Sequence, residues 1–469
     1  MRLTRRLFLA ALGLVGLVAV GAYAWQFDGL AGPDGIAPLA DGMEGLRRGG
    51  LGPLDVPTLL WISSSTAFIK ALLSLSCAAC LCLLFGLAPR WACFVLWACW
   101  GSIVQVGHPF LAFQWDLLLT ETAFCAFFLA PGGLRPHHSL EPEPHVAWRW
   151  LFAVLACKVT LESGLVKLLG GDPTWRDLTA LTWHWWTQPL PTWTSVAMSR
   201  LPLVVQQAMC AGMFVFELLI PLLVFLPRRP RLVGAVGMIA LQIALSATGN
   251  FSFYNVLTLL LSIPLLDDRF LQAVSPTAPV RERGPHSRGA WQWVVVVVFA
   301  GISGVQFLAR GVDSRVLEFI SRFDSINAYG AFARMTKNRA EIVLEGSRDG
   351  ATWEPYEFPW KPGRLDRRPG FVAPWQPRLD WQMWFASLGT CGNNPWVLTL
   401  QLRLLEERPE VLALFASAPE HPKYLRTTSY EYRFAPAGSP DWWVRTEVGP
   451  YCPMVMIGAD GRLQRAVVR

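Results

Sequence analysis

Long runs of apolar residues recur along the first two thirds of this chain, and short polar or basic connections separate them. Crossing the hydrocarbon core of a bilayer takes roughly 17–25 helical residues. The pattern therefore predicts about nine membrane-spanning segments, some of them re-entrant. These segments lie near residues 6–25, 57–87, 91–107, 115–131, 149–169, 204–226, 231–248, 251–266 and 291–309.

The pattern changes after residue 310, where short alternating runs replace the long apolar ones. Residues 340–358 contain two strand-like runs around a Ser-Arg-Asp-Gly turn, which predicts a β-hairpin. Residues 424–434 alternate with a period of two, as a half-buried strand does. A further strand is expected near residues 442–451.

Two helix signals interrupt these strands. Residues 376–389 end on Gly389, a suitable C-cap, and the next helix has Asn394 at its N-cap with Pro395 at the first helical position. We therefore expect a polytopic α-helical membrane domain over residues 1–309. A C-terminal extracytoplasmic β-rich domain, β-sandwich-like with a helical insertion, is expected over residues 310–469.

Composition supports a membrane protein. Hydrophobic residues make up 53% of the 469 residues, with 23 Trp and 27 Phe, which is too apolar for an ordinary soluble chain. The net charge of +7 could indicate nucleic acid, but the arginines lie between apolar runs rather than in one basic stripe. We therefore expect no nucleic-acid partner.

The arginines predict the orientation. When nine segments are threaded, the arginine-rich connections fall on one side, and the positive-inside rule makes that side cytoplasmic. An odd number of spans then leaves the N-terminus inside and everything after about residue 310 outside. The connections carry Arg2, Arg5, Arg6, Arg90, Arg135, Arg149, Arg228, Arg229, Arg231, Arg281, Arg283 and Arg288.

The N-terminus has an alternative interpretation. Residues 1–24 have a basic start, an apolar middle and a small-x-small ending, which resembles a cleavable signal, even one of twin-arginine type. Both interpretations place the connection that begins at Trp25 outside the cytoplasm, so the predicted topology is the same.

Cysteine usage follows the same division. Eight of the ten cysteines lie in predicted spans, where a thiol acts as a small apolar residue. Cys391 and Cys452 are the two in the outer domain, and an oxidising compartment would permit them to pair.

Several charged residues lie at membrane depth, where each would cost several kcal/mol if it faced lipid unpaired. Lys158 and Glu162 are four apart, so a local ion pair is available. The alternatives are charges that hold the bundle together and a substrate cavity or catalytic carboxylate.

Residues 175–193 contain five tryptophans, which suit the headgroup zone, together with polar residues that suggest a hydrogen-bonded structure at the membrane mouth. The predicted polar cluster on the membrane face comprises Asp116, Glu121, Lys158, Glu162, Lys167, Trp175, Arg176, Asp177, His184, Gln188, Glu217 and Asn255.

Familiar catalytic motifs are absent from the sequence. There is no phosphate-binding P-loop, no H-E-x-x-H zinc motif and no G-x-S-x-G elbow. We expect no catalytic residue and no metal.

Seven blocks of the sequence resemble the signature blocks of the lipase maturation factor family, from about Trp25 to Pro453. The resemblance departs from the family pattern at Trp375, where a histidine is expected, and at Cys452, where an aromatic residue is usual. The blocks are residues 114–131, 162–191 ("ESGLVKLLGGDPTWRDLTALTWHWWTQPLP"), 248–268, 328–358, 376–389, 393–405 and 442–451.

The resemblance implies a membrane-bound folding factor, not an enzyme, that assists a secreted client protein such as a lipase and needs no cofactor. In eukaryotic relatives the compartment is the endoplasmic reticulum. The twin-arginine-like start and short loops look bacterial, which implies the inner (plasma) membrane, a periplasmic C-terminal domain and contact with membrane lipids. The alternative is a membrane enzyme that resembles the vitamin K-dependent carboxylase in layout, with Lys158, Lys167 or His184 as its base.

The helical insertion concentrates tryptophan and arginine, which often anchor interfaces. We predict that it faces either the client or the membrane domain. In the alternative interpretation Arg378 and Asp380 organise a turn, and Trp381 and Trp384 form a core-facing stripe. The predicted interface comprises Arg378, Asp380, Trp381, Trp384, Asn393, Asn394, Pro395 and Trp396.

Overall fold

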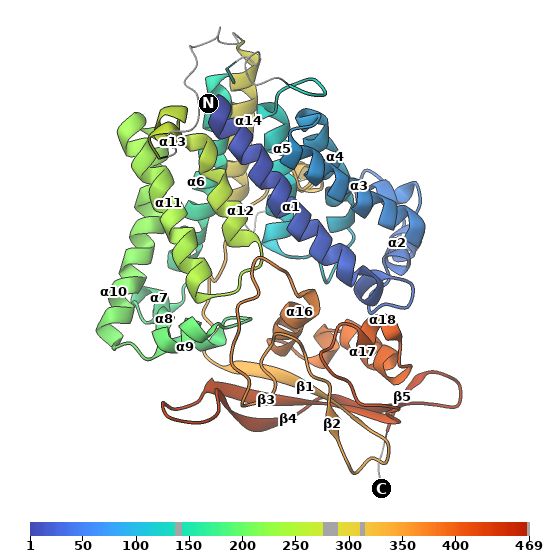
Figure 1. Cartoon of the computed structure of the whole chain (residues 1–469). Helices are drawn as coiled ribbons and strands as arrows, with labels where there is room; N and C mark the ends of the chain where they lie inside the picture. Colours follow the sequence, from blue (N-terminus) through green and yellow to red (C-terminus); the bar gives the residue numbers. More distant parts are fainter. Residues whose placement is uncertain (137–142, 275–288, 310–314, 467–469) are drawn as a thin grey trace.

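The computed structural model describes residues 1–136, 143–274, 289–309 and 315–466, and it has helices at one end and a β-sheet at the other (Figure 1). We call α1 to α14 the helical part and residues 315–466 the β-rich part. Three of the arginines used for the topology, Arg281, Arg283 and Arg288, lie outside the described residues.

The helical part contains fourteen described α-helices and four short 3-10 or π segments. The helices are α1 (Arg2–Ala31), α2 (Leu39–Arg48), α3 (Thr66–Phe85), α4 (Pro89–Val104), α5 (Gln114–Leu129), α6 (Val146–Leu169), α7 (Pro173–Arg176), α8 (Ala180–Thr187), α9 (Trp193–Ser199), α10 (Leu203–Phe214), α11 (Arg228–Thr248), α12 (Tyr254–Leu261), α13 (Asp268–Val274) and α14 (Trp291–Leu308). The short segments are η1 (Leu59–Trp61), η2 (Val215–Leu219, π-helical), η3 (Ile220–Phe225) and η4 (Ile263–Leu265).

Each of the nine predicted apolar runs contains helix. Among the described residues, five helical segments are long and apolar enough to cross a membrane by length and composition: Arg2–Ala31, Thr66–Phe85, Leu203–Phe225, Arg228–Thr248 and Trp291–Leu308. The helices of the other four runs are shorter or more charged: α4 and α5 have 16 residues each, α12 has 8, and α6 carries buried lysines and a glutamate. Nine spans therefore remain a prediction.

Close packing of α1 on α3 depends on small residues. A Cβ added at Gly13 would lie 2.5 Å from the backbone oxygen of Cys80, so the two helices approach as closely as glycine allows. Lys70 at the start of α3 pairs with Asp28 near the end of α1, which shows that the two helices run antiparallel.

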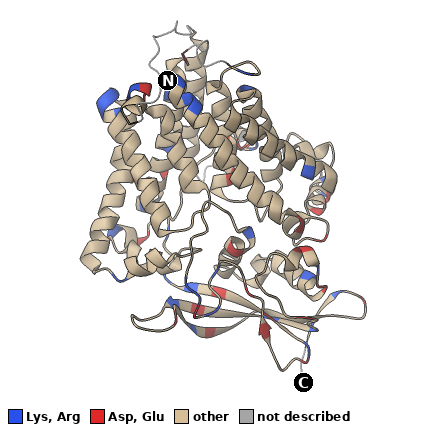
Figure 2. Cartoon of the chain, viewed as in Figure 1, with Lys and Arg blue, Asp and Glu red and all other residues tan. Residues whose placement is uncertain are grey.

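The arginine-bearing connections gather at the end of the helical part that carries the N-terminus (Figures 1 and 2). The amino group of Met1 lies 2.9 Å from Asp268, Arg90 donates to the carbonyl of Ala130, and Arg228 pairs with Asp267. The β-rich part lies at the opposite end (Figure 1).

The sheet has five antiparallel strands in the order β2-β1-β3-β4-β5. The predicted hairpin and the two further strands are confirmed. Their bounds are β1 (Arg339–Ser347), β2 (Glu354–Pro355), β3 (Tyr424–Phe434), β4 (Trp443–Ile457) and β5 (Leu463–Arg465).

The predicted helical insertion lies between β2 and β3 as α16 (Arg378–Ser387), η5 (Cys391–Asn393), α17 (Trp396–Leu405) and α18 (Pro409–Leu412), while α15 (Arg315–Ser321) precedes the sheet. These insertion helices lie between the sheet and the helical part (Figure 1). The described residues form one sheet covered by helices, so the β-sandwich-like expectation is wrong: the apolar face of the sheet is buried against α16 and α17 instead of a second sheet.

The predicted helix caps are shifted by one residue. The helix α16 ends with Leu388 as its C-cap rather than Gly389, and α17 has Pro395 rather than Asn394 at its N-cap. The amide of Asn394 donates instead to the Tyr451 hydroxyl at 3.1 Å and the Thr390 carbonyl at 3.0 Å. Because these partners hold the side chain away from the helix, it cannot serve as the cap.

Candidate functional site

The first residue of α16 joins the two parts of the molecule. The Arg378 guanidinium makes a bidentate ion pair with Asp116 of α5, with N···O distances of 2.8 and 2.9 Å, and it also donates to the Phe110 carbonyl at 2.8 Å. Both side chains of the pair are completely buried. Sequence analysis had assigned them separately to the interface and to the membrane face, and the structure brings them together.

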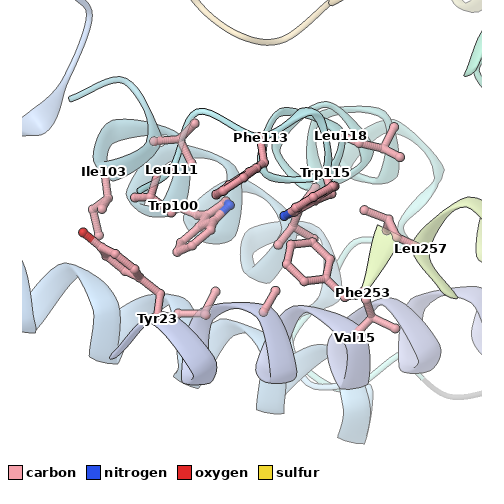
Figure 3. Close-up of a cluster of buried hydrophobic side chains, with 14 of the residues drawn as sticks. Val15, Tyr23, Trp100, Ile103, Leu111, Phe113, Trp115, Leu118, Phe253 and Leu257 are labelled. Carbon is pink, nitrogen blue, oxygen red and sulfur yellow. The ribbon is translucent and has the colours of Figure 1, made fainter. Parts of the chain in front are cut away.

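Aromatic rings and α1 surround this pair. The guanidinium carbon of Arg378 lies 5.2 Å from the ring centroid of Tyr23 and 5.9 Å from that of Trp100. Figure 3 shows these two rings close to Phe113 and Trp115, between α1 and the α4–α5 region. Gln26 of α1 accepts from the Arg378 backbone N–H at 2.9 Å and donates to the Gln376 carbonyl at 2.7 Å.

The predicted interface tryptophans face the helical part. The ring centroid of Trp381 lies 4.8 Å from that of Trp115, and Trp396 contacts Phe110 edge to face at 5.7 Å. The indole N–H of Trp384 donates to the Thr187 carbonyl at 3.1 Å. All three tryptophans are buried, so they serve the junction between the two parts and are not available to a client in this conformation.

Asp380 has a different role, as the alternative interpretation proposed. Its Oδ1 accepts from the backbone N–H groups of Trp360 and Lys361 at 2.8 and 2.7 Å, which fixes a turn of the β-rich part. Burial raises the pKa of Asp380 to about 6, although the two N–H groups and the nearby Lys361 charge act to lower it.

The other predicted interface residues lie near the surface. Asn393 and Pro395 are exposed and Asn394 is partly buried, all close to the disulfide between Cys391 of η5 and Cys452 of β4. This disulfide ties the helical insertion to the sheet.

A second junction was missed by sequence analysis. Arg339 of β1 donates to the carbonyls of Trp186 in the last turn of α8 and of Gln188 and Pro189 just after that helix. Its guanidinium also pairs with Glu341 at 2.7 Å, and Glu341 pairs with Lys361 at 2.9 Å. In an alternating strand, charges at positions 339 and 341 look solvent-facing, and their placement on one face of β1 was the available signal.

The third junction is a segment that precedes the sheet and inserts among the helices. Glu121 of α5 accepts hydrogen bonds from the hydroxyl of Tyr329 and from the Asn327 backbone N–H, and it pairs with Lys158 of α6. Glu162 accepts from the Tyr329 N–H at 2.6 Å. The predicted Lys158–Glu162 pair is therefore replaced by tertiary partners for both residues, because the inserted segment brings a donor for Glu162 and α5 brings a carboxylate for Lys158.

A second buried pair joins α6 to the broken α10–η2 helix. Lys167 lies 2.6 and 2.7 Å from the two carboxylate oxygens of Glu217, and its ammonium lies 5.4 Å from the ring centroid of Trp175. The helices meet at Gly164, where an added Cβ would lie 2.9 Å from the Cβ of Glu217. Both lysines proposed as bases are thus paired with buried carboxylates.

The tryptophan-rich stretch forms the surface on which the β-rich part rests. The indole N–H of Trp175 donates to the Phe332 carbonyl of the β-rich part at 2.9 Å, and Gln188 holds the stretch to α11 by donating to the Thr248 carbonyl at 3.0 Å. His184 is stacked on Phe251, and burial, followed by the Lys167 charge, lowers its pKa to about 4, so the ring is neutral at pH 7.

The remaining members of the predicted membrane-face cluster are dispersed. Arg176 and Asp177 are exposed at the end of α7, and Asn255 is buried in α12. Asn250, which the prediction omitted, bridges to the β-rich part by donating to the Gly370 carbonyl at 2.8 Å and accepting from the Val372 N–H at 2.8 Å.

The arrangement is suited to holding two parts in a fixed geometry. Within the described ranges, no group of three or more His, Cys, Asp or Glu side chains could hold a metal ion. The buried charges are instead used as pairs that join helices to one another and to the β-rich part.

Comparisons with known proteins match both parts of the chain. Residues 3–273 match the family model described as the lipase maturation factor transmembrane domain, and residues 325–453 match the lipase maturation factor C-terminal domain. No solved structure matches. With its apolar helices, the first match identifies an integral membrane protein.

Curated relatives are similar along nearly the whole chain. Lipase maturation factor 2 of Homo sapiens is 32% identical over 97% of this chain and 83% of that protein. Lipase maturation factor 1 of Bos taurus is 32% identical over 96% of this chain and 88% of its own length, and the Homo sapiens protein of that name gives 32% over 96% and 87%. The comparisons offer no support for the carboxylase-like alternative, and the chain belongs to the lipase maturation factor family.

Proposed function

We propose that this protein is a membrane-bound maturation factor that assists the folding of a secreted client of the lipase type, without catalysing a reaction of its own. The observation that carries the proposal is the similarity to lipase maturation factors over both the helical and the β-rich parts. A factor of this kind works by binding a client, so its chemistry needs a rigid surface rather than a reactive group.

The β-rich part is the portion that meets the client, and it lies outside the cytoplasm. Two observations support this placement. The arginine-bearing connections gather at the opposite end of the molecule, as the positive-inside rule expects of a cytoplasmic side. The Cys391–Cys452 disulfide suits an oxidising compartment such as the periplasm.

The three junctions give the β-rich part its fixed position above the membrane. Arg378, Arg339 and the inserted Tyr329 are each buried against helices of the first part. We propose that the division at residue 310 separates a membrane anchor from a client-binding part, and that the junctions stop the second from moving freely on the first.

The client surface is the exposed side of the sheet. The insertion helices lie on the side toward the helical part, and the other side carries no helix in the described chain (Figure 1). Val448 of β4 is 69% exposed, and Arg445 lies over the Tyr430 ring at 4.4 Å. An exposed apolar residue on a strand that also carries an arginine packed on an aromatic ring is typical of a protein-binding surface.

The function is tested by producing a secreted lipase from the same organism in cells with and without this chain. We expect loss of the chain to lower the lipase activity per milligram of secreted lipase, while lipase synthesis is unchanged. The proposal is wrong if the specific activity is the same in both cells.

The client surface is tested by Val448→Asp. We expect this variant to lower lipase maturation while keeping its own abundance and melting temperature. Leu54→Asp is the matched control, since Leu54 is 72% exposed but belongs to the helical part. Equal loss in both variants would contradict a specific surface on the sheet.

The orientation is tested with reporter fusions. Fusions after Arg229 should report a cytoplasmic location, and fusions after Gly249 and at the C-terminus should report an external one. A cytoplasmic C-terminus would contradict the proposed meeting with a secreted client.

A further inference from the structure

A cavity opens between α6, η3 and α11 at the end of the helical part that carries the N-terminus. Its volume is about 330 Å³, within the range of about 300–1,000 Å³ typical of small-molecule sites. The lining combines two guanidinium groups, those of Arg149 and Arg231, with apolar side chains that include Trp150, Phe225 and Leu226.

The cavity has an excess of positive charge. Arg231 donates to the Leu265 carbonyl at 3.0 Å and lies 3.6 Å from Asp267, which is already engaged by Arg228. Among the described residues, Arg149 has no hydrogen bond or ion pair. The other nearby acid, Glu143, lies 3.4 Å from the amino group of Met1.

The position of the cavity matches the headgroup level of a bilayer. It lies within about a turn of the start of α6 at Val146 and of α11 at Arg228. The Trp150 ring is stacked on Phe225 with centroids 5.8 Å apart, and tryptophan is enriched at this depth.

An apolar surface continues from the cavity along the side of the helical part. Leu226 on the rim, Leu222 and Leu219 are 49%, 46% and 60% exposed and follow one another on the η2–η3 segment. A ligand with a negatively charged head and an acyl chain would meet the arginines with its head and these leucines with its chain.

We propose that this cavity binds the phosphate of an anionic phospholipid headgroup. Arg149 supplies a guanidinium that makes no hydrogen bond within the described residues, Arg231 supplies a second positive charge, and the leucine surface contacts an acyl chain. Basic pockets between membrane helices bind such headgroups by the same combination of charge and depth. The proposal concerns lipid binding and is independent of the client.

The experiment uses the full chain in a neutral detergent, with its melting temperature measured before and after adding phosphatidylglycerol or phosphatidylcholine. We expect phosphatidylglycerol to raise the melting temperature by about 3–5 °C, as a ligand of the folded state does, and phosphatidylcholine to raise it less. Arg149→Gln should remove at least half of this rise.

Matched variants separate a site from general attraction. Arg229→Gln is the control, since Arg229 is exposed in the same connection but does not line the cavity. It should keep the full rise, and Arg149→Lys should keep part of it. An equal rise in Arg149→Gln and the unaltered chain would overturn the proposal.

A second measurement covers the case in which Arg149→Gln lowers the stability of the chain by itself. Native mass spectrometry of the unaltered chain from cell membranes should detect bound phosphatidylglycerol. Inorganic phosphate is added in a separate melting experiment. If phosphate alone gives the whole rise in melting temperature, the cavity binds a free anion and the lipid proposal is wrong.

Discussion

Two buried arginines hold the β-rich part on the helical part, and they do so in different ways. Arg378 faces a single carboxylate, Asp116, in a closed bidentate pair. Arg339 faces three backbone carbonyls and shares its carboxylate, Glu341, with Lys361. The first junction has one ion pair, whereas the carboxylate of the second has two cationic partners, Arg339 and Lys361.

This difference determines how much the free energy of unfolding falls when each arginine is removed. Removing Arg378 leaves the fully buried Asp116 without its charge partner, whereas removing Arg339 leaves Glu341 still paired with Lys361. A buried charge left without its partner is more costly than a set of lost hydrogen bonds to carbonyls. Loss of Arg378 should therefore lower the stability of the fold more than loss of Arg339.

The largest effect is expected at the first junction. Arg378→Met should lower the free energy of unfolding by about 3–5 kcal/mol because it strands a buried carboxylate. The double variant Arg378→Met with Asp116→Leu should recover much of this loss. The measurement is thermal unfolding in detergent, and a double variant no more stable than Arg378→Met would contradict the ion-pair explanation.

The next largest loss of stability is expected on removing the disulfide, which lies within the β-rich part rather than between the two parts. Replacing Cys391 and Cys452 by alanine should cost roughly 2–4 kcal/mol, because the bond closes a loop with a sequence separation of 61 residues. Limited proteolysis should then cut near η5 while the helical part stays intact. A reductant should reproduce the result on the unaltered chain, and its failure to do so would show that the alanine variant acts by another route.

Arg339→Gln should cost less, about 2 kcal/mol, because Lys361 continues to neutralise Glu341. Thermal unfolding measures this, with Arg348→Gln as the control at an exposed ion pair with Glu420, where the expected change is below about 1 kcal/mol. A loss at Arg339 equal to that at Arg378 would refute the claim that Lys361 continues to neutralise Glu341.

The smallest change is expected at Asp380. Asp380→Asn retains an oxygen for the two turn N–H groups and removes a buried charge, so stability at pH 7 should change by less than about 1 kcal/mol. The pH dependence should change instead. Because the folded pKa is about 6 against the ordinary 3.8, the folded chain holds this proton more tightly, so its contribution is favourable at low pH and is lost as pH rises through 6.

Unfolding between pH 4 and 7 measures this slope, which Asp380→Asn should remove. Asp349 provides the control, since hydrogen bonds from Thr352 and Ala351 lower its pKa to about 2 and give a slope of the opposite sign at lower pH. Asp349→Asn should therefore leave the slope between pH 4 and 6 in place, and its disappearance there would contradict the assignment to Asp380.

The sequence was sufficient for the elements but not for their partners. Apolar runs and alternation locate helices and strands because both depend on local periodicity. The same reasoning suggested Glu162 as the partner of Lys158, four residues away, whereas the structure pairs Lys158 with Glu121, 37 residues earlier. Spacing along one helix cannot reveal which other helix lies beside it.

The second junction was missed for a related reason. Arg339 and Glu341 lie in a strand where charged residues usually face solvent, yet both side chains are fully buried here. Their burial follows from the contact between β1 and the end of α8, which no local pattern encodes. The sequence indicated Arg378 as an interface residue because of its type, and Asp116 as a candidate functional residue because of its depth in the membrane. It did not indicate that the two form a pair.

The inserted segment also determines when some buried contacts of the helical part can form during synthesis. Glu121 receives the hydroxyl of Tyr329 from 208 residues later in the chain, and Glu162 receives its N–H from 167 residues later. At about 5–20 residues per second, roughly 10–40 s separate the synthesis of α5 from that of Tyr329. During that interval Glu121 can already pair with Lys158, but the Tyr329 hydroxyl and N–H donors do not yet exist, so completion of the bundle waits for the segment that leads into the sheet.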